Sequence, residues 1–156
     1  VFDQHHHQLD QIIEGFEDLG PLGNELLTPT KIYAKTVAAI ANDVEIHGMA
    51  HVTGGGFIEN LPRMMPESLG AEIELGSWPV LRIFDMLQEK GSLTDRDLFS
   101  VFNAGIGFVL AVAAKDADQV VASALASGEQ AYIIGQVSGK SGVQFIGEQD
   151  GTLDEQ

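Results

Sequence analysis

Residues 47–57 of the chain are HGMAHVTGGGF, and this stretch is the strongest structural signal in the sequence. Residues 47–53 predict a β-strand that runs directly into three consecutive glycines, Gly54 to Gly56. Glycine loses more backbone freedom on folding than any other residue, so three together indicate a turn where the backbone approaches a ligand or another segment closely. Successive N–H groups in such a turn can form a concave anion site. A short helix is predicted to follow at 59–65.

Two interpretations of this glycine turn remain open from its residues alone. It could bind an anion, or it could be a tight strand-to-helix turn without a ligand; it lacks the Lys-Ser/Thr pair of a P-loop and the spacing of a dinucleotide-binding loop. His51, at the end of the predicted strand, could act as an acid or base near neutral pH, or could be a half-buried histidine with a structural partner. His47, on the same face, is predicted to lie on the surface.

The sequence on both sides of the glycine turn predicts a mixture of helices and strands. Thr30 and Ser77 are expected to cap two helices, and Thr94 with Asp97 fits a capping box at a third. The other predicted elements are a helix over 116–126 and strands over 71–75, 106–112, 131–137 and 143–146. The apolar, β-branched strand at 106–112 is typical of the centre of a sheet. Together these elements favour an α+β fold with a mixed or mostly antiparallel sheet and packed helices.

Two further polar residues are candidates for ligand contact. Asn103 lies in the sequence FNAG, residues 102–105, where it could hydrogen-bond a ligand or serve as a turn residue that tolerates positive φ. Arg63 follows the glycine turn closely and could hold a phosphate with two hydrogen bonds. It could equally form an exposed ion pair with Glu59 or Glu67.

The composition excludes several classes of partner. The chain has 8 Lys and Arg against 23 Asp and Glu, a formal net charge of -15, so its overall field repels nucleic acid and anionic lipid. We therefore predict neither nucleic-acid nor membrane binding, and we expect any anionic ligand to be held by local N–H groups. The chain has no cysteine, which fits the reducing cytoplasm that we predict as its location. No stretch approaches the ~20 apolar residues of a membrane span.

Several motifs together resemble one enzyme family. In order along the chain they are LLTPTKIY, HGMAHVTGGGFIENLPRMMP, GSWPVLRIFDMLQEKG, VFNAGIGFVLAV and AYIIGQV, between about Glu25 and Ile146. This series is similar to the aminoimidazole ribonucleotide synthetases, also called phosphoribosylformylglycinamidine cyclo-ligases. Several long motifs in register are much more specific than a single glycine turn.

The resemblance implies an ATP-dependent ligase with two α/β domains, of which this chain resembles the second. The family closes the imidazole ring of formylglycinamidine ribonucleotide in purine biosynthesis, and the full-length enzyme is expected to be a homodimer that uses ATP and Mg²⁺, with their ligands mainly in the N-terminal domain. By this resemblance, residues 1–25 are predicted to be an extended lead-in from that domain, 26–148 the C-terminal α/β domain, and 149–156 a mobile acidic tail. The chain alone is expected to be inactive.

The same resemblance assigns provisional roles to residues. The glycine motif falls on Thr53, Gly54, Gly55 and Gly56, which are predicted to bind a phosphate of the substrate or the nucleotide, with Arg63 as a further phosphate contact.

His51 and Asn103 are predicted to orient the reacting part of the substrate as catalytic residues, and no metal ligand is predicted. Two alternatives remain: a separate binding module for a small phosphorylated ligand, and another ATP-binding member of the same superfamily. The pairing of AHVTGGGF with FNAGIG favours the cyclo-ligase over the latter.

Overall fold

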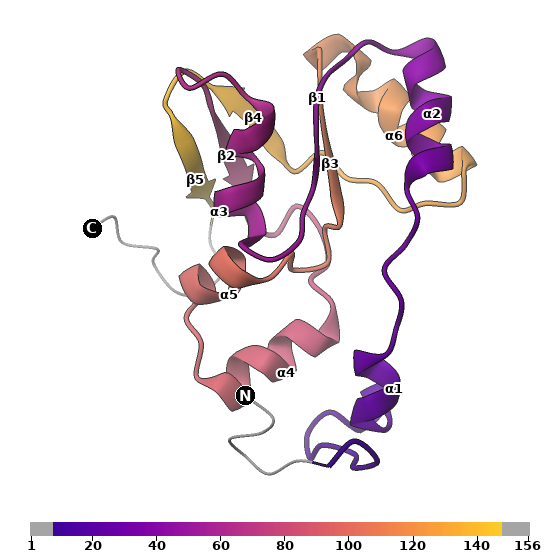
Figure 1. Ribbon diagram of the computed structural model, residues 1–156, viewed down its shortest axis with the longest axis vertical. Helices are drawn as coiled ribbons and strands as arrows, with labels where there is room; N and C mark the ends of the chain where they lie inside the picture. The colour runs from indigo at the N-terminus through magenta and orange to yellow at the C-terminus, as the bar shows by residue number, and fades with distance from the viewer. Residues whose placement is uncertain (1–7, 148–156) are drawn as a thin grey trace.

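The computed structural model of the chain describes residues 8–147, which form short helices packed around two small sheets (Figure 1). The α-helices are α1 (Leu22–Leu26), α2 (Ala34–Asp43), α3 (Gly56–Asn60), α4 (Arg82–Gly91), α5 (Asp95–Val101) and α6 (Ala117–Ala126). The 3-10 helices are η1 (Glu17–Leu19), η2 (Pro62–Met64) and η3 (Ala114–Asp116). The strands are β1 (Ile46–His51), β2 (Gly70–Glu74), β3 (Phe108–Val112), β4 (Gly135–Ser138) and β5 (Gly142–Ile146). None of the helices in these residues could cross a membrane.

The five strands confirm the mixed α+β class and are divided between two sheets. β1 pairs antiparallel with β3, and His51 lies opposite Phe108 in their register. In the second sheet β2 lies between β4, to which it is antiparallel, and β5, to which it is parallel. β2 is therefore flanked on both sides by β4 and β5, the two strands that are joined by the turn at 139–141.

The prediction that 106–112 forms a central strand is wrong, because among the described residues β3 pairs only with β1. The predicted strand at 131–137 is regular only over β4, from Gly135 onward. The preceding residues approach β2 instead of β3, and the Glu74 N–H donates to the Ile134 carbonyl at 2.8 Å. An apolar strand need not be central when helices cover it: Leu110 and Val112 of β3 pack against the core between α2 and α6.

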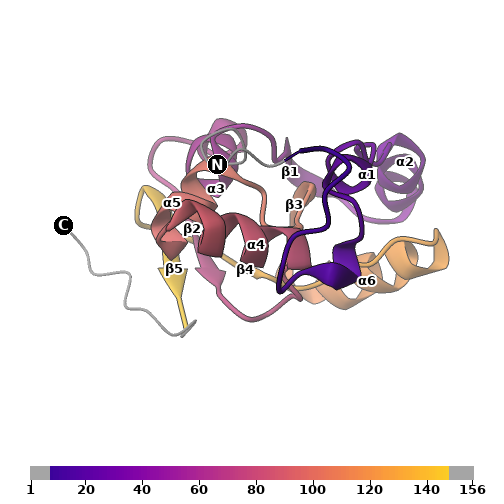
Figure 2. The same cartoon turned by 90° about the horizontal axis from the view of Figure 1, so that it is seen from below.

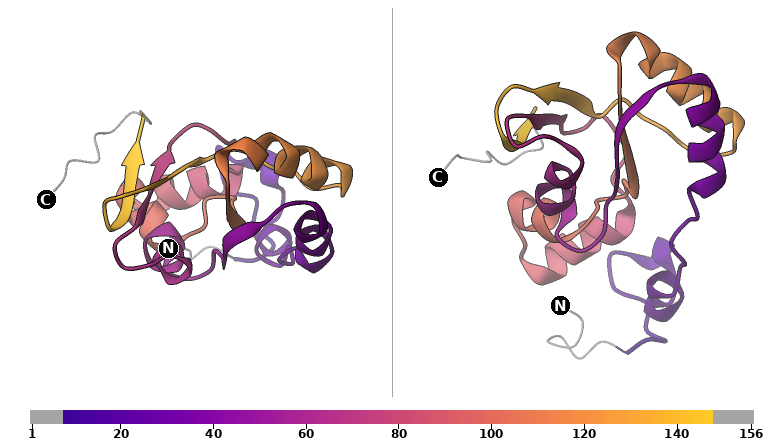
Figure 3. Two further views of the ribbon diagram at one scale, coloured as in Figure 1. Left: turned by 90° about the horizontal axis from the view of Figure 1, so that it is seen from above. Right: turned by 45° about the horizontal axis from the view of Figure 1, so that its top comes forward.

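Two groups of helices cover the sheets on different sides. Seen from below, α2 and α6 lie together at one side, and α3, α5 and the three-stranded sheet lie at the other (Figure 2). The ribbon of β1 and β3 runs between these groups (Figure 3). The main core lies under α3 and α5, where the rings of Phe57, Trp78 and Phe99 pack edge-to-face or tilted. Helix α3, which follows the glycine turn, and α5, which packs against it, are thus held by buried aromatic side chains.

The N-terminal segment corrects the expected extended lead-in over 1–25. Its described part, from residue 8 onward, folds back on itself through η1 and α1, and lies beside α4 at the bottom of Figure 1. Ile13, Phe16 and Leu22 form a separate buried cluster with Met86 of α4. The sparse apolar residues of this segment did not suggest a core, because their partner Met86 is far along the chain. The predicted tail at 149–156 lies outside the described residues, as do residues 1–7.

The predicted helix caps have different outcomes. The Thr94 capping box is confirmed: its hydroxyl accepts a hydrogen bond from the Asp97 N–H, and the Asp97 carboxylate accepts one from the Thr94 N–H. Thr30 is not a cap, because α2 begins only at Ala34. Ser77 is not a cap either, because its hydroxyl donates to the Glu74 carbonyl in the turn after β2.

Candidate functional site

The glycine turn begins where β1 separates from β3. The Val52 N–H donates to the Gly107 carbonyl at 2.9 Å, and the chain then turns into α3. Gly55 has a φ of 90° and Gly56 a φ of 53°, both in the left-handed region that favours glycine. Gly54 does not share this requirement. Two of the three glycines are therefore needed for the turn itself, whether or not it binds a ligand.

The glycine turn packs directly against the second motif that the sequence analysis selected. A Cβ atom on Gly56 would lie 2.8 Å from the Phe102 carbonyl oxygen and closer still to that of Phe99. These carbonyls belong to the end of α5 and the start of the 102–105 loop. Because residue 56 has no side chain, the two loops can touch although about fifty residues separate them in sequence. The structure thus brings together the two predicted motifs.

The 102–105 loop is held in a strained turn. The Gly105 N–H donates to Asn103 Oδ1 at 3.1 Å, and Ala104 between them is fully buried with a φ of 46°. The buried Trp78 ring N–H donates to the Ala104 carbonyl at 2.9 Å and fixes this conformation. The oxygen of Asn103 therefore has the turn role that the sequence allowed. Its amide nitrogen has no hydrogen-bond partner within residues 8–147, which leaves the ligand role open as a prediction.

His51 lies on the exposed side of the β1–β3 ribbon, at the end of β1. Its ring centroid is 5.7 Å from that of Tyr33 and 6.0 Å from that of Phe108. The Tyr33 hydroxyl occupies the space that a Cβ on Gly107 would need, and burial raises the pKa of this hydroxyl above its usual range. Within the described residues no hydrogen bond or ring contact joins His51 to Asn103.

Arg63 has the ion pair that was one of its two predicted alternatives. Its guanidinium lies 3.5 Å from Glu59 Oε2, and both side chains are largely exposed. The Glu59 carboxylate in turn covers Gly55, since a Cβ there would lie 2.5 Å from Oε2. An exposed pair of this kind contributes little to stability. It leaves both charged groups beside the glycine turn and able to rearrange around a ligand.

Asn60 is a residue that the sequence analysis missed. Its side chain is 3% exposed, and Nδ2 donates to the carbonyls of Gly56 at 2.7 Å, Gly54 at 3.2 Å and Thr53 at 3.4 Å. A signal was available in the sequence FIENL, residues 57–61. Helical spacing puts Asn60 on the same face as the apolar Phe57 and Leu61, and a polar side chain on a buried face requires partners.

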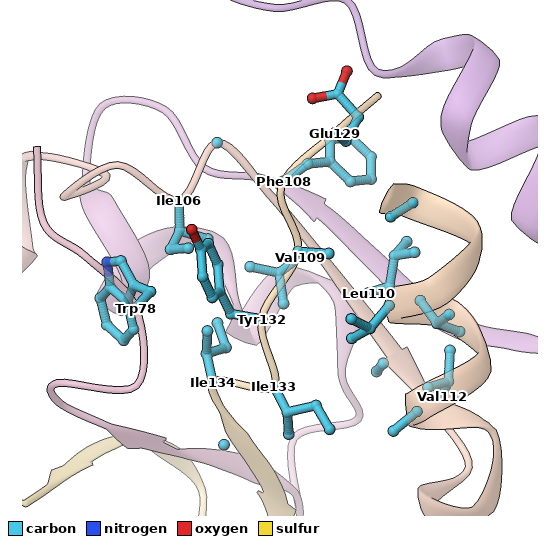
Figure 4. Close-up of a pocket in the computed structure, with 18 of the residues that line it drawn as sticks. Trp78, Ile106, Phe108, Val109, Leu110, Val112, Glu129, Tyr132, Ile133 and Ile134 are labelled. Carbon is cyan, nitrogen blue, oxygen red and sulfur yellow. The ribbon is translucent and has the colours of Figure 1, made fainter. Parts of the chain in front are cut away.

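A separate apolar pocket of about 1070 Å³ lies between β3 and residues 131–134 (Figure 4). Val109, Tyr132 and Ile134 are among its lining residues, with Trp78 and Ile106 toward one end. None of the predicted site residues lines it. Within the described part of the chain, no three His, Asp or Glu side chains converge on a point where a metal ion could be held.

Comparison with known proteins identifies the family to which this site belongs. The family model described as "AIR synthase related protein, C-terminal domain" matches residues 3–148. The chain is 58% identical over 153 residues to a phosphoribosylformylglycinamidine cyclo-ligase of Lysinibacillus sphaericus. The alignment covers 98% of this chain and 44% of that relative. It is 53% identical over 147 residues to the enzyme of the same name from Bacillus subtilis, with 94% and 42% covered.

A solved structure has a similar fold. The hydrogenase maturation protein HypE of E. coli aligns with a TM-score of 0.58 over 74% of this chain and 36% of that protein, at 24% sequence identity. At this identity the likeness concerns the fold alone. The chain spans less than half the length of the two cyclo-ligases it matches.

Proposed function

This chain belongs to the AIR synthase related family, whose C-terminal domain it contains, and we propose that it acts as that domain in an ATP-dependent cyclo-ligase. The proposed reaction converts formylglycinamidine ribonucleotide to aminoimidazole ribonucleotide in purine biosynthesis. Phosphoryl transfer from ATP activates the formyl oxygen, the amidine-derived nitrogen attacks the formyl carbon, and phosphate leaves as the ring closes. Positioning and charge stabilisation dominate catalysis of such a transfer.

The contact between the two motif loops is the observation that best supports this function. Gly56 lies against the carbonyls of Phe99 and Phe102, so the glycine turn and the 102–105 loop form one continuous edge of the domain. Two loops with exposed polar groups, each fixed from behind by buried aromatic side chains, are suited to hold a substrate in one orientation. The sequence identity of over 50% to two named cyclo-ligases supports this reaction over those of other members of the superfamily.

The roles proposed for individual residues follow from their positions. The N–H groups of Thr53, Gly54 and Gly55 contact a phosphate of the substrate or the nucleotide, and Arg63 moves from Glu59 to the same phosphate. The Gly56 N–H already donates to the Thr53 carbonyl at 3.0 Å, so Gly56 contributes the close packing of the turn instead. The amide nitrogen of Asn103, which has no hydrogen-bond partner among the described residues, and the exposed ring of His51 orient the reacting part of the substrate.

The remaining groups of the reaction are assigned outside the described residues. ATP is a substrate of the proposed reaction, and Mg²⁺ is expected to accompany it. Residues 8–147 contain no cluster of three His, Asp or Glu side chains that could hold a metal ion, so no magnesium ligand is assigned to them. These ligands, and the contacts of a homodimer, are proposed to belong to the N-terminal domain of the full enzyme, which closes a cleft over the two loops.

A domain-exchange experiment tests the proposal. We would replace the matching C-terminal part of the Bacillus subtilis relative by this chain, which is 53% identical to it, and assay ATP-dependent formation of aminoimidazole ribonucleotide. We expect the hybrid to be active and this chain alone to be inactive. A hybrid that folds and binds ATP but does not close the ring would contradict the proposal.

Variants of the hybrid separate the site from the scaffold. His51→Ala and Asn103→Ala should each lower kcat about 100-fold or more if the side chains orient the reacting atoms. His47→Ala is the matched control for His51, because it is exposed on the same face of β1 and has no proposed role. Equal losses in the His47 and His51 variants would point to a general defect of the strand.

A further inference from the structure

Asn60 is a buried polar side chain that donates several hydrogen bonds to the glycine turn. Its amide nitrogen donates to three carbonyls of one turn, those of Thr53, Gly54 and Gly56. Its oxygen has only the long contact of 3.5 Å from Arg63 Nη1. Since an amide nitrogen has two hydrogens, the three carbonyls share its donors. These contacts do more than satisfy Asn60, because they determine which way the glycine turn faces.

The direction of a carbonyl fixes the direction of the next N–H group. The carbonyl of one residue and the N–H of the following residue belong to a single planar peptide group, and in the trans form they point in opposite directions. No described peptide bond is cis. The Thr53 and Gly54 carbonyls point toward Asn60, so the N–H groups of Gly54 and Gly55 point away from it. Both N–H groups lack a hydrogen-bond partner within residues 8–147.

We propose that Asn60 is a positioning residue, which aims the Gly54 and Gly55 N–H groups at the phosphate that the glycine turn contacts. The inference rests on the proposed function of that turn and adds the residue that controls it. Helix α3 has only five residues, so a helix dipole does not orient these donors. The Thr53 carbonyl is held by the Asn60 side chain and by the Gly56 N–H, which donates to it at 3.0 Å. Within the described residues only Asn60 bonds the Gly54 carbonyl, whose peptide group carries the Gly55 N–H. Asn60 does not touch the substrate in this arrangement, since its side chain is buried behind the turn.

The alternative is that Asn60 only stabilises the fold, and two substitutions of similar size distinguish these roles. Asn60→Leu keeps the volume and removes every donor. Asn60→Asp keeps the shape and replaces the donor by a carboxylate that faces three carbonyls. When the new carboxyl is protonated it again donates one hydrogen to the turn. Acidification should therefore partly restore the phosphate response of Gly54 and Gly55 in Asn60→Asp and leave that of Asn60→Leu unchanged. A purely structural role would change the free energy of unfolding of the variants but not the phosphate response of their folded chains.

The experiment records the backbone amide NMR signals of Gly54 and Gly55 in this chain, first free and then titrated with inorganic phosphate. In the wild-type chain we expect both signals to move with phosphate. In Asn60→Leu we expect the free signals to be displaced and the apparent phosphate affinity to fall about tenfold or more. Ile73→Val is the control: Ile73 lies in the main core with Phe57 and Leu61, and the change should lower stability slightly without affecting either signal.

The outcomes separate this inference from the proposed function. If phosphate leaves both wild-type signals unmoved, the proposed phosphate contact is wrong, and the positioning role that rests on it is wrong too. If the wild-type chain responds and a folded Asn60→Leu chain responds equally, the positioning role is wrong and the phosphate contact stands. If Asn60→Leu loses the response and Asn60→Asp recovers it on acidification, the positioning role is supported.

Discussion

At the residue scale, the glycines of the turn are not equivalent. Gly56, the first residue of α3, packs against the end of α5, with carbonyl oxygens where a side chain would begin, whereas a Cβ on Gly54 would meet nothing within 4 Å. Gly55 lies between these cases, with a φ of 90° and the Glu59 carboxylate beside it. The only glycine whose substitution probes ligand contact without disturbing the fold is therefore Gly54.

Alanine substitutions should reveal this difference. Gly56→Ala should lower the free energy of unfolding by about 2–5 kcal/mol, because it combines a left-handed conformation with a clash against two carbonyls. Gly54→Ala should change it by less than about 1 kcal/mol. Urea denaturation of both variants measures the two values. A Gly56→Ala chain as stable as the wild type would show that the glycine turn and the 102–105 loop are not in contact.

At the element scale, α5 connects the capping box to the site. Its first turn is held by Thr94 and Asp97, and its last turn supplies the Phe99 carbonyl that faces Gly56. The hydrogen bond from the Thr94 hydroxyl, followed by that from its backbone N–H, lowers the pKa of the Asp97 carboxyl below its ordinary value. The charged form is thus favoured in the folded chain, so this stabilisation is complete above the unfolded pKa and is lost as the pH falls through the folded pKa.

Thr94→Ala should lower the free energy of unfolding by about 1 kcal/mol at neutral pH, because it removes the helix cap. The difference from the wild type should shrink as the pH falls through the lowered pKa of Asp97, since the carboxylate that pairs with Thr94 then becomes protonated. Urea denaturation at a series of pH values measures this trend. Ser100→Ala is the control on the same helix, because its hydroxyl bonds the Asp97 backbone carbonyl, which does not titrate. A pH-independent Thr94 effect would argue against the linkage.

At the scale of the whole molecule, the described residues have a main core, a cluster between α2 and α6, and a smaller core at the N-terminal end. The smaller core is built on Phe16, which is 3% exposed and lies under two cations, with the Arg82 guanidinium carbon 4.6 Å and the Lys90 nitrogen 5.6 Å from the ring centroid. The Arg82 guanidinium also donates to the Gly15 carbonyl. The segment is therefore attached to α4 and does not touch the glycine turn through any of these contacts.

Phe16→Ala should detach residues 8–27 from α4 and leave the main core intact. Removing the Phe16 ring leaves a cavity in the smaller core, at a cost of about 3–5 kcal/mol. This cost exceeds what the remaining contacts of so short a segment can offset. Hydrogen exchange should become faster at the Leu22 and Gly23 amides, which bond the Gln11 and Leu9 carbonyls, and should stay unchanged in β1. Leu27→Ala is the control, because Leu27 is 80% exposed. Faster exchange throughout the chain would mean that the two cores unfold together.

The sequence by itself determined the features that depend on neighbouring residues. The β1 strand, the glycine turn, the capping box at Thr94 and the helix α6 were all predicted close to their observed positions, because their signals lie within a few residues of one another. The motif series also indicated the family, which the comparisons confirm. His51 was correctly placed at the end of a strand, and Asn103 in a turn.

Only the tertiary structure decided features that join distant residues. The exclusion of β3 from the larger sheet, the burial of Phe16 against α4, and the choice of Glu59 as partner of Arg63 depend on which groups come within contact distance after folding. The direction of the glycine-turn N–H groups is of the same kind. It depends on a side chain whose partners are backbone carbonyls, and backbone carbonyls are present at every residue, so no letter of the sequence identifies which of them Asn60 will bind.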